Sequence, residues 1–283
     1  MTAPTPVSFV ETDIETLAEA QGRIAILVDD AGKLDVAGRR VNRLTKGALK
    51  RALEAKADDL TAGAVFTLAY PAGMAADAVD VLCVPRNASL AKARAAGASV
   101  GRQRGKADVL FAAGNSKWAA QVLLAIVLRD YTFRDHKTSG DEAAGQITVM
   151  CSAPDKLSEQ VAPLMAVAEG TFFTRDLVSE PANVLTTTEF AERLSELENL
   201  GLVVEVLEED KLEELGMRTL LAVGQGSASP SKVVVMQWNG GDQDAAPLAL
   251  VGKGVVFDTG GISLKPAGGM EDMTMDMGGA GVV

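Results

Sequence analysis

The first 150 residues alternate between short apolar segments of strand length and longer segments with helical periodicity. This alternation is typical of α/β layer structures, because a helix after each strand returns the chain to the start of the next strand. The predicted strands are residues 7–10, 23–28, 64–69, 79–84, 109–112 and 146–150. The predicted helices are residues 46–56, 89–101 and 116–131, the last apolar on nearly every face and therefore buried. An α/β domain is predicted over residues 1–150.

A long helical segment then leads into a second part of the chain. Residues 151–178 are interpreted as a linking helix, and residues 179–283 as a second α/β domain. Thr186 and Glu189 have the spacing of a capping box at the start of a helix. The further predicted elements are strands at 202–207, 219–223, 232–238 and 248–257, and a short helix at 210–215. Because the runs at 232–238 and 248–257 are almost continuously apolar, both are expected to be strands buried on two faces.

Charge and composition exclude several classes of protein. The net charge is −11 and the isoelectric point is near 4.7, which argues against a nucleic-acid-binding surface. No secretory signal and no apolar run of membrane-spanning length are visible, so a cytoplasmic protein without a membrane partner is expected. Cys83 and Cys151 lie in separate apolar segments and are interpreted as reduced core thiols.

The histidine content limits the possible catalytic sites. His136 is the only histidine, and it lies in a polar segment at 132–145 that is expected to be a loop. A zinc site with two histidine ligands is therefore excluded, and so is any catalytic triad that does not use His136.

The residues with chemical potential concentrate between positions 251 and 276. Lys253 lies inside an apolar run, where a charged ammonium is costly unless it is compensated. Asp258 follows that run and precedes Gly260 and Gly261, which allow the backbone to turn sharply near a ligand. Lys265 and Asp276 come after this turn. Two carboxylates and two amines near one glycine-rich turn suggest a site for hard cations and an electrophilic substrate.

The mixture of ligand types bears on which metal would bind. Carboxylates suit magnesium, manganese or zinc, and a nitrogen ligand favours zinc or manganese. A lysine can bind a metal only as the neutral amine, and deprotonation at pH 7 costs roughly 4–5 kcal/mol, which a neighbouring dication can offset. The alternative interpretation is that two ion pairs simply stabilise a buried turn.

Two stretches of the chain resemble the M17-type leucyl aminopeptidases. These are VGKGVVFDTGGISLKP followed by MEDMTMDMGGA, and RDLVSEPANVLTTTEFAERL upstream of them. The spacings among Lys253, Asp258, Lys265 and Asp276 all match the pattern of that family. The resemblance implies an N-terminal α/β domain joined by a helix to an α/β catalytic domain, here incomplete, and assembly as a homohexamer.

The resemblance also implies roles for individual residues. Lys253, Asp258 and Asp276 correspond to ligands of two divalent metal ions, zinc or manganese, with Asp258 bridging the ions. Lys265 corresponds to the catalytic lysine that polarises the substrate carbonyl. Met273 corresponds to part of the pocket for the substrate's first side chain. The implied activity is a metal-dependent aminopeptidase, a hydrolase that releases N-terminal, Leu-like residues from peptides.

One part of the family pattern is not found in these 283 residues. The family carries a further motif, Asn-Thr-Asp-Ala-Glu-Gly-Arg, which supplies an Asp and a Glu ligand and an Arg that holds a bicarbonate acting as general base. Two carboxylates alone cannot balance two dications. We therefore expect the chain by itself to bind metals weakly, to be inactive, and to leave apolar surface exposed in its second domain, as a piece of a longer enzyme would.

Two other interpretations compete with this one. Asp258-Thr259-Gly260 matches the triplet of aspartic proteases, but that chemistry needs a second such Asp or a symmetric all-β dimer, which the strand–helix alternation does not fit. The other is a non-catalytic binding or regulatory module that retains a relict metal site.

Overall fold

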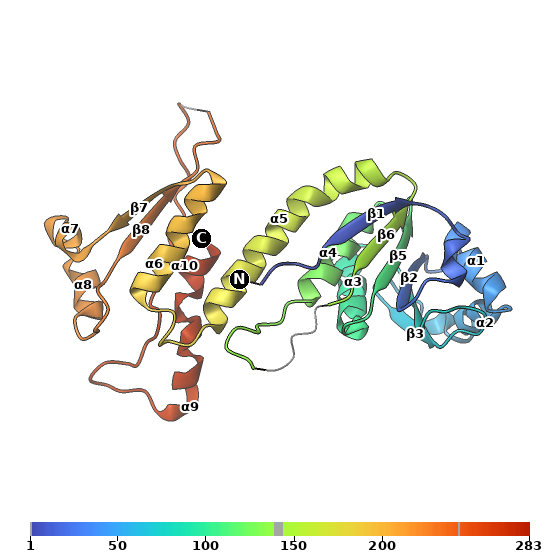
Figure 1. Cartoon of the computed structure of the whole chain (residues 1–283), viewed down its shortest axis with the longest axis horizontal. Helices are drawn as coiled ribbons and strands as arrows, with labels where there is room; N and C mark the ends of the chain where they lie inside the picture. The colour runs from blue at the N-terminus through green and yellow to red at the C-terminus, as the bar shows by residue number, and fades with distance from the viewer. Residues whose placement is uncertain (1, 139–143, 243) are drawn as a thin grey trace. The chain divides into compact units, whose positions relative to one another are not determined.

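A computed structural model of the chain describes residues 2–138, 144–242 and 244–283 (Figure 1). The chain divides into two compact units, Met1–Phe172 and Phe173–Val283. Helix α5 (Pro154–Ser179) runs through the division between them. The helix confirms the long helical segment predicted between the two parts of the chain, whereas the domain limits of 1–150, 151–178 and 179–283 stay a prediction.

The first unit is built on a six-stranded sheet with the order β1-β6-β5-β2-β4-β3. Neighbouring strands are parallel except for the β3–β4 pair, which is antiparallel. This mostly parallel sheet with helices between its strands confirms the predicted α/β class. The strands are β1 (Val7–Glu11), β2 (Arg23–Val28), β3 (Val65–Ala69), β4 (Ala78–Cys83), β5 (Val109–Gly114) and β6 (Ile147–Cys151).

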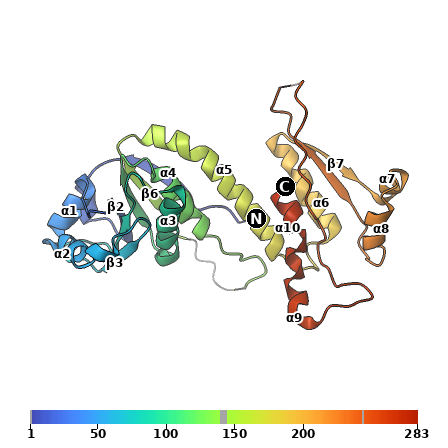
Figure 2. The same ribbon diagram turned by 180° about the vertical axis from the view of Figure 1, so that it is seen from behind.

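Helices cover both faces of this sheet (Figure 2). On one face, α3 and α4 pack with Phe111 and Val149 of the sheet, and on the other, α1 and α2 pack with Ile26 and Val81. Helices α3 and α4 approach closely, since a Cβ at Gly97 would lie 2.2 Å from the carbonyl oxygen of Val122. The helices are α1 (Val36–Leu44), α2 (Ala48–Ala55), α3 (Leu90–Arg104) and α4 (Ala119–Arg129), with 3₁₀ turns η1 (Thr16–Ala18) and η2 (Ala57–Asp59).

The sequence predictions for this unit hold with one omission. Helix α4 is buried as expected, with Leu123 and Ile126 fully enclosed. Helix α1 was not predicted, because its sequence, VAGRRVNRL, contains a glycine and several charges. Its start does carry a local signal, since the Asp35 carboxylate accepts a hydrogen bond from the Gly38 amide at 2.8 Å.

The second unit joins the end of α5 to a small sheet and several short helices. Strands β7 and β8 form an antiparallel pair. The core collects Leu177 of α5, Phe190 and Leu194 of α6, and Met277. The elements are α6 (Thr187–Ser195), η3 (Glu196–Leu200), β7 (Val203–Leu207), α7 (Glu209–Glu214), α8 (Arg218–Gly224), β8 (Val233–Gln237), α9 (Ala267–Met270), η4 (Glu271–Met277) and α10 (Gly278–Val282).

The predicted helix start at Thr186 is half confirmed. The Thr186 hydroxyl accepts a hydrogen bond from the Glu189 amide at 3.2 Å. The Glu189 carboxylate, however, accepts from Arg193 Nε at 2.8 Å, because an arginine one helical turn along the same helix offers a charged donor. The Thr186 side chain therefore caps the helix as predicted, whereas the Glu189 side chain pairs with Arg193 instead of completing the capping box.

Two strand predictions in this unit are wrong. Residues 219–223 belong to helix α8, because Leu220, Leu221 and Ala222 are strong helix formers and no neighbouring strand in the described part of the chain holds them extended. Residues 248–257 are irregular, and Leu248 and Val251 are 86% and 95% exposed. A strand needs a partner for its backbone groups, and the sheet of this unit contains only β7 and β8 among the described residues. Strand β8 is half-buried rather than buried for the same reason.

The exposed apolar surface expected for the second unit is therefore present. As for membrane segments, the part of the chain that the structure describes contains no helix with the length and hydropathy needed to cross a bilayer.

Candidate metal centre

The site is assembled from two pieces of backbone. Lys253 lies in an irregular segment that runs against α10, where the Ala280 amide donates a hydrogen bond to the Lys253 carbonyl at 2.9 Å. Asp276 lies at the end of η4, next to Met277, which is fully buried in the core. The buried methionine thus anchors the segment that carries Asp276.

The turn from Asp258 to Lys265 closes on itself. The Gly260 amide donates to Asp258 Oδ1 at 2.8 Å, and the Lys265 amide donates to the Thr259 carbonyl at 2.9 Å. Gly260 has φ of +91°, and a Cβ there would lie 2.4 Å from the carbonyl oxygen of Ser263. Glycine is therefore required at this position, as the sequence predicted for a sharp turn beside a carboxylate.

The four charged side chains meet as two ion pairs. Lys253 Nζ lies 2.7 Å from Asp276 Oδ1, and Lys265 Nζ lies 2.6 Å from Asp258 Oδ2. Lys265 Nζ also donates to the Asp258 carbonyl at 3.1 Å. The expected burial of Lys253 is wrong, because its side chain is 57% exposed on an irregular segment rather than enclosed in a strand.

The electrostatics favour the ionised form of Asp258. The hydrogen bond from Lys265 lowers the pKa of Asp258, and the Gly260 amide and the charges of Lys265 and Lys253 lower the pKa further. The charge of Lys253 is the smallest of these contributions.

Asp276 keeps one oxygen that the protein does not satisfy. Its Oδ2 atom is buried and has no hydrogen-bond partner among the described residues. A buried carboxylate oxygen without a donor is costly, and a cation can satisfy it. This orphaned oxygen, a second carboxylate and an amine fit part of a site for a dication.

The ligand set is nevertheless small. Within residues 2–138, 144–242 and 244–283, no group of three or more His, Cys, Asp or Glu side chains could hold a metal ion. His136 is exposed in the first unit, with its ring 6.1 Å from that of Phe133. Part of the loop predicted at 132–145 lies outside the described residues.

Met273 is half-buried in η4, three residues before Asp276. Its place in a substrate pocket stays a prediction.

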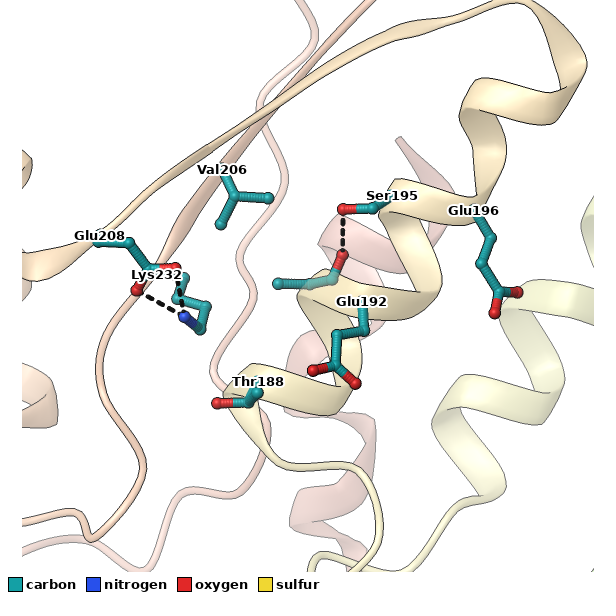
Figure 3. A pocket seen from close by; sticks show the side chains of 8 residues that line it. Thr188, Glu192, Ser195, Glu196, Val206, Glu208 and Lys232 are labelled. Atoms are coloured by element: carbon teal, nitrogen blue, oxygen red, sulfur yellow. Dashed lines mark hydrogen bonds and ion pairs between the residues drawn. The ribbon is translucent and has the colours of Figure 1, made fainter.

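A separate cavity of about 440 Å³ opens between α6 and β7 (Figure 3). Its charged lining is mostly acidic, with Glu192 and Glu196 on the helix side and Glu208 on the strand side. Glu208 is already paired with Lys232, whose Nζ lies 2.6 Å from its Oε1. The cavity contains none of the residues predicted for the metal centre, and no sequence motif marked it. Its lining residues are Thr188, Ala191, Glu192, Ser195, Glu196, Val206, Glu208 and Lys232.

Comparison with known proteins supports the resemblance. Residues 172–283 match the model of the cytosol aminopeptidase family, catalytic domain. Among curated proteins, the chain is 54% identical to a probable cytosol aminopeptidase of Cereibacter sphaeroides and 55% identical to one of Dinoroseobacter shibae. Both matches cover 100% of this chain and 58% of the relative, so the chain spans little more than half the length of these relatives.

Solved structures agree with the fold. The bottromycin maturation enzyme BotP in complex with Mn is 31% identical, with a TM-score of 0.67 over 93% of this chain and 54% of that protein. A mutant of tomato leucine aminopeptidase has a TM-score of 0.74 over 99% of this chain and 58% of that protein, at 19% identity. With the family match, the close relatives and the shared fold in agreement, this chain belongs to the M17 cytosol aminopeptidase family.

Proposed function

We propose that the segment from Lys253 to Asp276 forms part of a two-metal aminopeptidase site. The whole protein would release N-terminal, Leu-like amino acids from peptides. The observation that carries this proposal is the pairing of Lys253 with Asp276 and of Lys265 with Asp258 in the second unit, with Asp276 Oδ2 buried and, among the described residues, unsatisfied.

Lys253, Asp258 and Asp276 would hold two divalent ions, manganese or zinc, with Asp258 shared between them. Such ions, when bound, lower the pKa of water and polarise a carbonyl group. The structure of BotP in complex with Mn supports manganese as one choice of ion. Lys253 would bind as the neutral amine and would give up its ion pair with Asp276.

Lys265 would act as a cation throughout. Its ammonium group lies on the turn that presents Asp258, and there it would place positive charge beside the oxygen that becomes negative in the transition state. Met273 would contribute apolar surface to the substrate pocket, which fits a Leu-like side chain. The bicarbonate implied by the resemblance has no proposed ligand within residues 172–283.

The same proposal extends to the setting of the whole protein. A cytoplasmic homohexamer is supported by the resemblance, and the relatives themselves are named cytosol aminopeptidases. For the 283-residue chain alone we propose weak metal binding and no useful hydrolysis, because two carboxylates and one amine leave two dications poorly neutralised.

The ion pairs themselves favour one alternative. Each lysine already has a carboxylate partner without any metal, as a relict site in a non-catalytic binding module would have. The two interpretations differ in whether Mn²⁺ binds at Asp276.

Paramagnetic broadening in NMR spectra distinguishes them, because it detects even weak Mn²⁺ sites. In the 283-residue chain, Mn²⁺ should broaden the amide signals near Lys253, Asp258 and Asp276. Asp276→Asn should remove the broadening, whereas Asp272→Asn, an exposed acid in the same 3₁₀ helix, should leave it unchanged.

Equal broadening in Asp276→Asn would contradict the ligand assignment, and no broadening in the unaltered chain would favour the relict site. A calorimetric titration that found two tight sites on the unaltered chain would contradict the weak binding proposed here. For the whole protein, hydrolysis of leucine p-nitroanilide should disappear after dialysis against a chelator and return when Mn²⁺ or Zn²⁺ is added.

A further inference from the structure

The segment around Lys253 touches α10 backbone to backbone. A Cβ at Gly252 would lie 2.5 Å from both the Cα of Ala280 and the carbonyl oxygen of Gly279. From the other side, a Cβ at Gly279 would lie 3.0 Å from the Lys253 amide nitrogen. Only glycines allow this approach, which brings the Ala280 amide within 2.9 Å of the Lys253 carbonyl.

Lys253 therefore contacts the same helical stretch at two points. Its carbonyl accepts from Ala280, and its side chain reaches Asp276 at 2.7 Å. Asp276 and Ala280 are four residues apart, or about one helical turn. The position of the helical turn from Asp276 to Ala280 relative to the segment around Lys253 therefore sets the distance between the Lys253 amine and the Asp276 carboxylate.

The turn has little stability of its own. Helix α10 has the sequence GGAGV, and glycine is unfavourable in helices by about 1 kcal/mol relative to alanine. A helix of this length is not stable in isolation. Its position must come from tertiary contacts.

Those contacts come from the last turns of α5 (Figure 1). The Thr174 hydroxyl donates a hydrogen bond to the Gly281 carbonyl at 2.6 Å. Apolar contacts add to it, because the Val178 side chain lies 3.6 Å from a Cβ placed at Gly278. A hydrogen bond weakens steeply when its angle or length changes, whereas apolar packing is not directional. The Thr174 contact therefore fixes the position of α10 along α5 more narrowly than the apolar contacts do.

We propose that Thr174 is a positioning residue for the Lys253–Asp276 pair. Its hydroxyl holds the last turn of α10, and α10 in turn holds the Lys253 carbonyl and the segment that carries Asp276. Thr174 itself binds neither ions nor substrate. The consequence for metal binding rests on the proposed function, whereas the effect on the backbone does not.

The test compares three variants of the full chain. Thr174→Val removes the donor and keeps the shape, and Thr174→Ser keeps the hydroxyl. Thr171→Val is the matched control, since the Thr171 hydroxyl donates to Val167 within α5 itself at 2.7 Å. The first measurement is hydrogen exchange of the Ala280 amide, which needs no metal, and the second is Mn²⁺ broadening at Asp276.

In Thr174→Val we expect the Ala280 amide to exchange about fivefold faster, which is the effect of losing one typical hydrogen bond, and the Mn²⁺ broadening to weaken by a similar factor. Thr174→Ser and Thr171→Val should stay close to the unaltered chain. Unchanged exchange in Thr174→Val, or equal loss in Thr174→Ser, would overturn the proposal. If the unaltered chain shows no broadening at all, the metal assignment fails, and the exchange data still decide the positioning role.

Discussion

Cys83 and Cys151 are buried thiols, each at the last position of a parallel strand of the first unit. Burial and, to a smaller extent, the nearby charges of Asp30 and Asp29 together raise the pKa of Cys83 to about 11. Burial also raises the pKa of Cys151. Because the thiolate is the reactive form, neither cysteine is suited to be a nucleophile at neutral pH, in agreement with their interpretation as core residues.

The shift at Cys83 predicts a loss of stability in alkali. The folded protein prefers the neutral thiol, so this contribution is complete below the ordinary pKa of 9.0 and is lost as the pH rises towards 11. Between these limits, the free energy of unfolding should fall by roughly 1–3 kcal/mol more in the unaltered chain than in Cys83→Ala. Urea denaturation at several pH values measures the difference. Parallel pH profiles for the two proteins would contradict it.

Gly260 offers a second test at a single residue. Gly260→Ala would place a Cβ against the Ser263 carbonyl in a backbone conformation that costs an L residue about 1–3 kcal/mol. The turn should loosen, and the Lys265 amide, which donates to Thr259, should exchange about tenfold faster. Gly268→Ala is the control, because a Cβ there meets open space and its φ is −65°. Similar exchange rates in both variants would show that the turn does not depend on Gly260.

Among secondary-structure elements, strand β4 contains a fully buried acid. Asp80 accepts hydrogen bonds from Arg23 of β2 at 2.6 Å and 2.8 Å and from Thr67 of β3 at 2.6 Å. Thr67 is the register partner of Asp80, whereas Arg23 pairs with Ala78 two positions away. The acid thus connects three neighbouring strands.

Replacing Asp80 should cost more stability than replacing a surface acid. Asp80→Ala leaves the Arg23 guanidinium, only 15% exposed, without its carboxylate partner, and the expected cost is about 3–5 kcal/mol. Asp77→Ala, one residue before the same strand and exposed, should change stability by no more than about 0.5 kcal/mol. Urea denaturation followed by circular dichroism compares the two. Equal costs would mean that the buried pair contributes no more than a surface charge.

For the molecule as a whole, apolar exposure differs between the two units. Most of the large apolar side chains that are exposed over more than half of their surface lie in the second unit. Leu248, Val251 and Ile262 are 86%, 95% and 107% exposed. Exposed apolar surface is associated with interaction sites or with self-association when it is contiguous.

This surface should bind the hydrophobic dye anilinonaphthalene sulfonate. The double variant Leu248→Lys/Val251→Lys should lower dye fluorescence by about half and reduce light scattering at high protein concentration, because it removes two side chains of the exposed run. Val167→Lys is the control, since Val167 is 56% exposed but isolated on α5. Unchanged fluorescence in the double variant would mean that the side chains of Leu248 and Val251 are covered in solution.

The amino-acid sequence alone was sufficient for the elements that depend on nearby residues. The six strands of the first unit, helices α2 to α5 and the start of α6 follow from apolar periodicity, capping residues and turn formers, which act over a few positions. The choice of Lys253, Asp258, Lys265 and Asp276 also came from the sequence, because their spacing is a property of the chain itself, and their roles stay a prediction.

Only the tertiary structure decided which partners these residues meet. The run at 248–257 has the composition of a strand, yet it stays irregular because a ladder requires a neighbour distant in sequence. The same long-range dependence pairs Lys253 with Asp276 and Lys265 with Asp258, and brings Thr174 to Gly281, 107 positions away. Spacing along a chain does not encode such contacts, since they depend on how separate segments pack in three dimensions.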